Sequence, residues 1–264
     1  FIGKSLISYI LKNEKKIDKV YCISRSLTKI EGSLDRLKKI KIDILKLDKL
    51  PEVDGIIYLI NSSDYKKGLK IFYKFKTLIN KFKKKPKILY LSSGAIYGQN
   101  SSIKKLNEKN NINQRKINKY SNYKKEYALE KKYLENEFKQ LSNERFKVSI
   151  ARCFNFVGTE IEKENFIISK IINAIKFEVK IIVSKSKNTY RSYMHTNDMG
   201  RWLIKILISS ENIVFDTDVY NEQDFASDMR AYFDSVETPD KVAWNDSALD
   251  VDRLDELITE LASE

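Results

Sequence analysis

A serine, a tyrosine and a lysine in this chain are side chains that can move a proton to or from an alcohol. Ser93 stands in the segment Ser-Ser-Gly-Ala-Ile-Tyr-Gly, and Tyr127 and Lys131 stand in Tyr-Ala-Leu-Glu-Lys. A free phenol has a pKa of about 10 and is a poor base at neutral pH. A neighbouring ammonium favours the phenolate, so we expect Lys131 to lower the pKa of Tyr127. With the Ser93 hydroxyl on the same oxygen, the three groups could exchange a proton with a sugar hydroxyl.

The Tyr-x-x-x-Lys spacing does not by itself select a site. It occurs at Tyr120/Lys124 and at Tyr127/Lys131, in a lysine-rich chain with 15 tyrosines, where chance matches are expected. Residues four apart share one face of a helix. From spacing alone, a solvated helix face with a half-buried tyrosine is the favoured interpretation. The order of the motifs and the flanking strands must decide between this interpretation and a catalytic pair.

Short apolar runs alternate with amphipathic stretches along the chain. The runs predicted as strands are residues 19–24, 55–60, 87–91 and 147–151, and the helical patterns cover 5–13, 65–84, 123–140 and 166–177. Nearly continuous apolar strands are typical of parallel sheets that are buried on both faces. The alternation predicts an α/β fold with a Rossmann-like, doubly wound parallel sheet. Ser93 and Asn155 fall just beyond strand ends, where such sheets bind ligands.

The composition excludes several classes of protein. The net charge of +13 invites a nucleic-acid partner, but the lysines are spread along the chain, so we expect none. Cys22 and Cys153 lie in apolar runs without metal-ligand spacing, which favours a reduced, cytoplasmic protein and no metal. His195 is the single histidine, which excludes a multi-histidine site. No apolar run approaches the ~18 residues of a membrane helix, so we expect no membrane insertion.

The last fifty residues differ from the rest. Residues 215–264 hold fifteen acidic and three basic residues, a net −12, which leaves +25 for residues 1–214 of a chain whose total is +13. Two interpretations stay open for this segment, a native acidic helical lobe or a segment of different origin. Residues 246–262 have a helical apolar stripe. We therefore predict two parts, a Rossmann-like domain over 1–214 and an acidic, helical segment over 215–264.

Four motifs resemble those of one known family. Residues 92–98 are similar to a Ser-Ser-x-x-x-Tyr-Gly segment, and 127–135 to a helix with Tyr-x-x-x-Lys-x-x-x-Glu. Residues 152–158 and 191–198 are similar to Arg-x-x-Asn-x-x-Gly and Arg-x-Tyr-x-His-x-x-Asp. These are motifs of the extended short-chain dehydrogenases, the NAD-dependent epimerase/dehydratase family, and they occur in the family's order. The resemblance favours Tyr127 over Tyr120, which lacks the trailing glutamate.

The resemblance implies a role for each matched residue. Tyr127 would be the general acid/base, Lys131 its electrostatic partner and a ligand of the nicotinamide ribose, and Ser93 the partner of the substrate hydroxyl. Asn155 would contact the sugar of the bound nucleotide sugar. Arg191 would bind its diphosphate, although a surface arginine is an equal alternative from the residue alone. His195 and Asp198 are expected to be structural.

The resemblance also implies a dinucleotide, NAD or NADP. The chain begins at Phe-Ile-Gly, similar to the end of the family's glycine loop, so we expect Gly3 to belong to the cofactor site, with the first strand and two glycines missing. Arg25 follows the next strand, where an acidic residue would bind the ribose hydroxyls of NAD. An arginine there favours NADP slightly, and a solvated loop arginine is the alternative.

The expected function is therefore that of a nucleotide-sugar epimerase, dehydratase or reductase in surface-polysaccharide precursor synthesis. Family dehydratases often carry Asp-Glu after the catalytic Ser or Thr, whereas this chain has Gly94 and Ala95, which lowers the dehydratase option. The alternative is a non-catalytic protein that binds a dinucleotide or a nucleotide sugar on the same fold. A homodimer is compatible with either.

Overall fold

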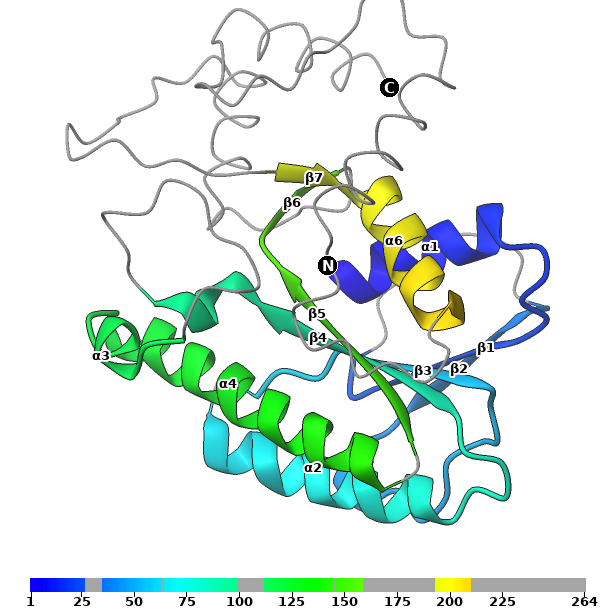
Figure 1. Ribbon diagram of the computed structural model, residues 1–264. Helices are drawn as coiled ribbons and strands as arrows, with labels where there is room; N and C mark the ends of the chain where they lie inside the picture. Colours follow the sequence, from blue (N-terminus) through cyan, green and yellow to red (C-terminus); the bar gives the residue numbers. More distant parts are fainter. Residues whose placement is uncertain (27–34, 63, 99–111, 145, 159–192, 210–264) are drawn as a thin grey trace, which may run out of the picture. The chain divides into compact units, whose positions relative to one another are not determined.

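The structure, a computed structural model, describes residues 1–26, 35–62, 64–98, 112–144, 146–158 and 193–209 (Figure 1). One compact unit comprises Phe1–Phe156 and Tyr193–Val219, and in the second only Val157 and Gly158 are described. The helix predicted at 166–177, the substrate ligand Arg191 and the acidic segment 215–264 lie outside the described residues.

The predicted strands are present and parallel. β4 (Lys87–Ser93) lies between β3 (Gly55–Tyr58) and β5 (Lys147–Cys153), and β1 (Val20–Ser24) pairs with β2 (Leu37–Lys41). Two short strands, β6 (Asn155–Val157) and β7 (Tyr193–His195), form a further pair. The fold is thus of the Rossmann-like α/β class that the sequence predicts.

The helices form a layer on each face of the sheet (Figure 1). α2 (Tyr65–Asn80) and α4 (Asn122–Asn143) pack together on one face, and α1 (Ile2–Asn13) and α6 (Thr196–Ser209) on the other. The shorter elements are η1 (Ile44–Lys46), η2 (Gly94–Tyr97) and α3 (Gln114–Ile117). Within the described ranges, no helix has the length and apolar character needed to cross a membrane.

β4 contributes to the core on both of its faces, as the alternation of side chains along a strand requires. Tyr90 packs in the cluster of α2 and α4, where its ring stacks on Phe138 with centroids 4.4 Å apart. Its neighbours Leu89 and Leu91 pack in the opposite cluster, against α1 and α6. Each aromatic pair of this kind contributes about 0.5–1.5 kcal/mol beyond its buried area. The carboxyl end of β4 is therefore held by packing on both faces.

Candidate active site

Ser93 is the last residue of β4 and the N-cap of η2. Its Oγ accepts a hydrogen bond from the backbone N–H of Ala95 at 3.2 Å. The turn ends at Gly98, whose φ of 74° lies in the left-handed region and whose added Cβ would come 2.5 Å from the backbone of Lys116. A fixed turn therefore presents the Ser93 hydroxyl at the carboxyl end of a central strand.

Tyr127 lies on α4, and its phenol is near enough to the Ser93 side chain for that hydroxyl to favour the phenolate. The helix is placed here by its apolar residues at helical spacing, Leu134, Phe138 and Leu141, which are all buried in the core between α2 and the sheet. Two residues that are 34 positions apart in the sequence therefore meet at one point of the fold.

Lys131 follows one helical turn later, and its side chain is buried, with 4% of the residue exposed. Its Nζ donates a hydrogen bond to the carbonyl oxygen of Leu91 at 3.0 Å. The same ammonium lies 5.7 Å from the ring centroid of Tyr127 and 5.3 Å from that of Tyr90. Burial lowers the pKa of Lys131, and nearby acidic groups, Glu130 foremost, oppose that effect. The structure thus brings Ser93, Tyr127 and Lys131 together.

The pKa of Tyr127 is raised, which differs from the lowered value expected from the sequence. Burial of the phenol is the largest cause, and the nearby Ser93 hydroxyl opposes it. A neighbouring ammonium alone would lower this pKa, whereas in the structure the Lys131 ammonium donates to Leu91 and the Tyr127 ring is desolvated. In this arrangement Tyr127 is protonated at neutral pH.

The competing pair, Tyr120 and Lys124, is arranged differently. Tyr120 precedes Ser121, the N-cap of α4, while Lys124 lies within the helix. The Tyr120 ring packs against a small apolar cluster that includes Ile117 and Ala128. The two residues therefore do not share a helix face, and their spacing has no geometric meaning.

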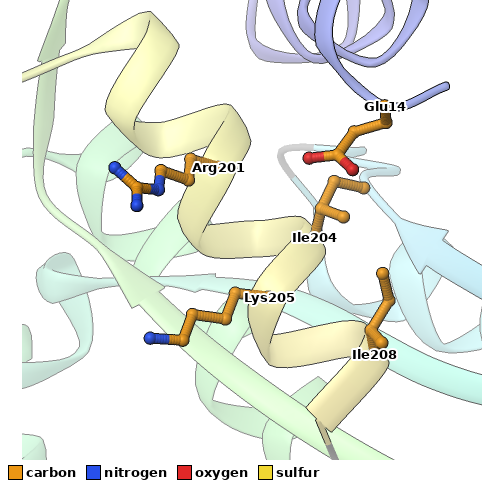
Figure 2. A pocket seen from close by; sticks show the side chains of 5 residues that line it. All are labelled: Glu14, Arg201, Ile204, Lys205 and Ile208. Carbon is orange, nitrogen blue, oxygen red and sulfur yellow. The ribbon is translucent and has the colours of Figure 1, made fainter. Parts of the chain in front are cut away.

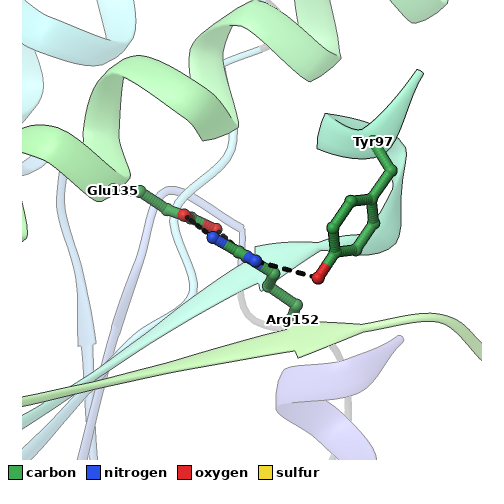
Figure 3. A network of polar contacts seen from close by, with 3 residues as sticks. All are labelled: Tyr97, Glu135 and Arg152. Carbon is green, nitrogen blue, oxygen red and sulfur yellow. Dashed lines mark hydrogen bonds and ion pairs between the residues drawn. The ribbon is translucent and has the colours of Figure 1, made fainter. Parts of the chain in front are cut away.

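A buried ion pair joins α4 to β5 beside these residues (Figure 3). The Arg152 guanidinium donates from Nε and Nη2 to the two Glu135 carboxylate oxygens, at 2.9 and 2.8 Å. Its Nη1 donates to the Tyr97 hydroxyl at 2.8 Å. The side chains of Arg152 and Glu135 are only 6% and 2% exposed. In the sequence, Arg152 and Glu135 were recognised only as positions of two motifs, and the structure shows that they bind each other.

The remaining predicted residues are more dispersed. Asn155 begins β6 and is half-buried. Arg25 is exposed directly after β1, and Gly3 lies in the first turn of α1. A Cβ added to Gly3 would meet Leu59 at 3.5 Å, an ordinary contact, so the space around it does not demand glycine. The His195 Nδ1 accepts from the backbone of Asn197 at 3.3 Å, at the turn between β7 and α6.

A small open pocket lies elsewhere, on the helical layer of α1 and α6 (Figure 2). Its lining consists of the Glu14 cap of α1 and four residues of α6: Arg201, Ile204, Lys205 and Ile208. None of the predicted site residues lines this pocket, so it is separate from the serine, tyrosine and lysine cluster.

Sequence reasoning missed Glu130, which is buried directly before Lys131 with 1% exposed. Its carboxylate accepts hydrogen bonds from the backbone and the hydroxyl of Ser62. A signal was available, because Glu130 stands four residues before the buried Leu134 and so occupies a position of the apolar stripe. A charged residue at such a position needs a partner in the core.

One known protein family matches most of this chain. The model of the NAD-dependent epimerase/dehydratase family matches residues 1–221. The chain belongs to this family. Its members are enzymes that depend on NAD. A search among curated proteins finds no match.

Solved structures show the fold of the family. A UDP-N-acetylglucosamine 4-epimerase from Methanobrevibacter ruminantium M1 has a TM-score of 0.60 at 21% identity, over 81% of this chain and 72% of its own. A UDP-glucuronic acid 4-epimerase from Bacillus cereus, in complex with NAD, has a TM-score of 0.62 at 18% identity, over 81% and 73%. A dTDP-glucose 4,6-dehydratase from Bacillus anthracis str. Ames, also with NAD, has a TM-score of 0.62 at 17% identity, over 81% and 71%.

Proposed function

We propose that this chain acts on a nucleotide sugar as an NAD(P)-dependent epimerase or keto reductase, in the synthesis of surface-polysaccharide precursors. The observation that carries the proposal is the placement of the Tyr127 phenol near the Ser93 side chain and the buried ammonium of Lys131. Membership of a family of NAD-dependent epimerases and dehydratases supports the reaction class. When bound, the dinucleotide supplies the hydride acceptor and donor.

The proton is moved by Tyr127. With its raised pKa, the phenol is in the form that donates a proton to a ketone oxygen, in the reductive direction. In the oxidative direction, Tyr127 must accept the proton of a sugar hydroxyl as a phenolate, and the positive charge of Lys131 stabilises that form. Ser93 holds the same substrate oxygen by a hydrogen bond and so orients it toward the phenol.

The residues present fit a dinucleotide at the carboxyl ends of the strands. Burying an ammonium is costly unless it has partners, and Lys131 is held beside the proton donor, where it would bind the nicotinamide ribose. The amino end of α1, with Gly3, would face the pyrophosphate, and Arg25 would reach the 2′-phosphate of NADP. Asn155 and Arg191 would bind the sugar and the diphosphate of the substrate.

A steric feature favours an epimerase or reductase over a dehydratase. A dehydratase needs a further acid/base pair, which family members often carry directly after the catalytic Ser or Thr. Here that position is Gly94, and a Cβ added to it would come 2.5 Å from the Phe154 ring. The Phe154 ring in turn stacks on Tyr97, with centroids 6.4 Å apart. An acidic side chain at position 94 would therefore have to displace this ring.

The proposal is tested by replacing Tyr127 with Phe and using Tyr120→Phe as the matched control, since both remove one hydroxyl from a Tyr-x-x-x-Lys pair. The full chain is incubated with NAD⁺ or NADP⁺ and with UDP and dTDP sugars, and the products are separated by chromatography. We expect Tyr127→Phe to lower turnover by about 10²–10⁴-fold, as the loss of a general acid/base does. Tyr120→Phe should retain it. Full turnover in Tyr127→Phe would refute the mechanism.

A further inference from the structure

Glu130 has no role in the reaction described so far, although its position is costly. Three charged residues of α4 are buried, Glu130, Lys131 and Glu135. Burying a charge is unfavourable unless it is paired and hydrogen-bonded. Glu135 has its partner in Arg152, and Lys131 has the Leu91 carbonyl. Glu130 makes its hydrogen bonds to a different part of the fold.

The Glu130 carboxylate reaches the loop that follows β3. Its Oε1 accepts from both the backbone N–H and the hydroxyl of Ser62, each at 2.9 Å. Ser62 stands two residues before Asp64, the N-cap of α2, whose Oδ1 accepts from the N–H of Lys67 at 3.0 Å. The carboxylate thus fixes the entry of the chain into α2 from the neighbouring helix.

The first turns of α2 are shaped around this carboxylate. A Cβ added to Gly68 would come 2.8 Å from the Glu130 Oε1 and 2.9 Å from its Cγ. Glycine at this position therefore leaves the volume that the glutamate occupies. Two elements, the loop at Ser62 and the helix at Gly68, accommodate the same carboxylate, so its placement is specific.

The charge of Glu130 acts on several titratable groups around it. From β3 and β4, Tyr58 and Tyr90 face it, and it adds to the effect of burial in raising the pKa of both phenols. On its own helix it raises the pKa of Tyr127 and opposes the lowering of the Lys131 pKa by burial. Cys153 of β5 and Glu135 also interact with Lys131. Adjacent helix residues do not face each other, so this effect passes through the poorly screened interior.

We propose that Glu130 is a positioning residue of the active site, whose buried carboxylate ties the β3–α2 loop to α4 and places a negative charge in the interior directly before Lys131 in the sequence. The inference rests on the proposed function, because a charged Lys131 is what holds the ribose and stabilises the Tyr127 phenolate. The carboxyl end of β3 belongs to the edge of the sheet where ligands bind, so one side chain links that edge to the proton-transfer residues.

The experiment separates the charge of Glu130 from its hydrogen bonds. Glu130→Gln keeps an acceptor for Ser62 and removes the charge, while Glu130→Asp keeps the charge and draws it back from Ser62. Glu126→Gln, on the same helix, is the control for charge loss. The protonation of Lys131 is followed by NMR of its side-chain nitrogen against pH, and exchange of the Ser62 N–H is followed by hydrogen–deuterium exchange. Neither readout requires turnover.

We expect Lys131 to lose its proton at a lower pH in Glu130→Gln than in the wild type, since a negative charge that favours the ammonium is gone. Glu130→Asp and Glu126→Gln should titrate like the wild type. The Ser62 N–H should exchange faster in Glu130→Asp, on the order of tenfold, and near the wild-type rate in Glu130→Gln.

Unchanged titration of Lys131 in Glu130→Gln, or an equal change in Glu126→Gln, would overturn the role of the charge. Unchanged exchange in Glu130→Asp would overturn the tie to Ser62. In the active enzyme, the alkaline limb of the pH–rate profile should move to lower pH in Glu130→Gln, which a purely structural role would not cause. If Tyr127→Phe retains activity while Lys131 titrates as expected, the proposed function fails and this inference about the charge stands.

Discussion

Breaking the buried pair of Glu135 and Arg152 should destabilise the fold far more than breaking an ion pair of the same length on the surface. The N–O distance is 2.8 Å both here and between Lys84 and Asp54. The side chains of the first pair are 6% and 2% exposed, and those of the second 82% and 91%. Glu135→Gln would leave the guanidinium without its counter-charge in the core, and such a loss costs about 3–5 kcal/mol.

This cost converts into a measurable change of melting temperature. For a domain of about 150–250 residues, 1 kcal/mol corresponds to roughly 2–4 °C, so Glu135→Gln should melt about 6–20 °C below the wild type. Asp54→Asn removes the exposed pair and should have the melting temperature of the wild type, because water screens the attraction between the two charges. Thermal unfolding followed by far-ultraviolet circular dichroism measures both variants under the same conditions.

A double variant tests whether the loss of stability comes from the unpaired buried charge. Glu135→Leu/Arg152→Met removes both charges and fills the volume with apolar groups, and it should be more stable than Glu135→Leu alone. The reasoning is refuted if Glu135→Gln melts within a degree or two of Asp54→Asn. It is also refuted if the double variant is as unstable as the two single losses added together.

Two further predictions concern the site and the buried phenols. Gly94→Ala places a methyl group 2.5 Å from the Phe154 ring, and because this ring is 46% exposed and can turn aside, urea unfolding should show a loss of no more than about 1 kcal/mol. A larger loss that Phe154→Ala relieves would show instead that the ring is held in place. Burial raises the pKa of Tyr58, Tyr90 and Tyr127, so the folded chain keeps protons that the unfolded chain releases near pH 10. Stability should be full below about pH 10 and fall as the pH rises above it, and tyrosinate absorbance beside circular dichroism should show these phenols ionising only as the chain unfolds.

The central strands and helices could be predicted from the sequence because each has a clear pattern of apolar residues. The runs that became β1, β3, β4 and β5 are nearly continuous in apolar residues, and the helical patterns of α2 and α4 begin within a residue of the observed helices. β2 was missed because Leu37–Lys41 carries three lysines and buries only Leu37. Its place in the sheet comes from parallel pairing with β1, which is a contact between distant residues that periodicity does not encode.

The candidate site, too, has properties that could be predicted from the sequence and properties that could not. Strand ends and helical spacing, which are local properties, indicate Ser93 and two candidate Tyr-x-x-x-Lys pairs, and the motif resemblance then favours Tyr127 and Lys131. The raised pKa of Tyr127 does not, because it depends on how deeply the ring is buried. Glu130 was missed for a related reason, since its partner Ser62 is 68 residues away and only the packing of α4 on α2 brings them together.

The contact between Gly94 and Phe154 also has a consequence for evolution. The half-exposed ring occupies the volume that a side chain at position 94 would need, so a substitution at 94 requires the ring to turn away from Tyr97. A lineage that acquires an acid at 94 therefore either loses this ring stacking or first replaces the phenylalanine by something smaller. A route from this chain to elimination chemistry thus involves Phe154, the residue that follows β5, which itself adds no catalytic group.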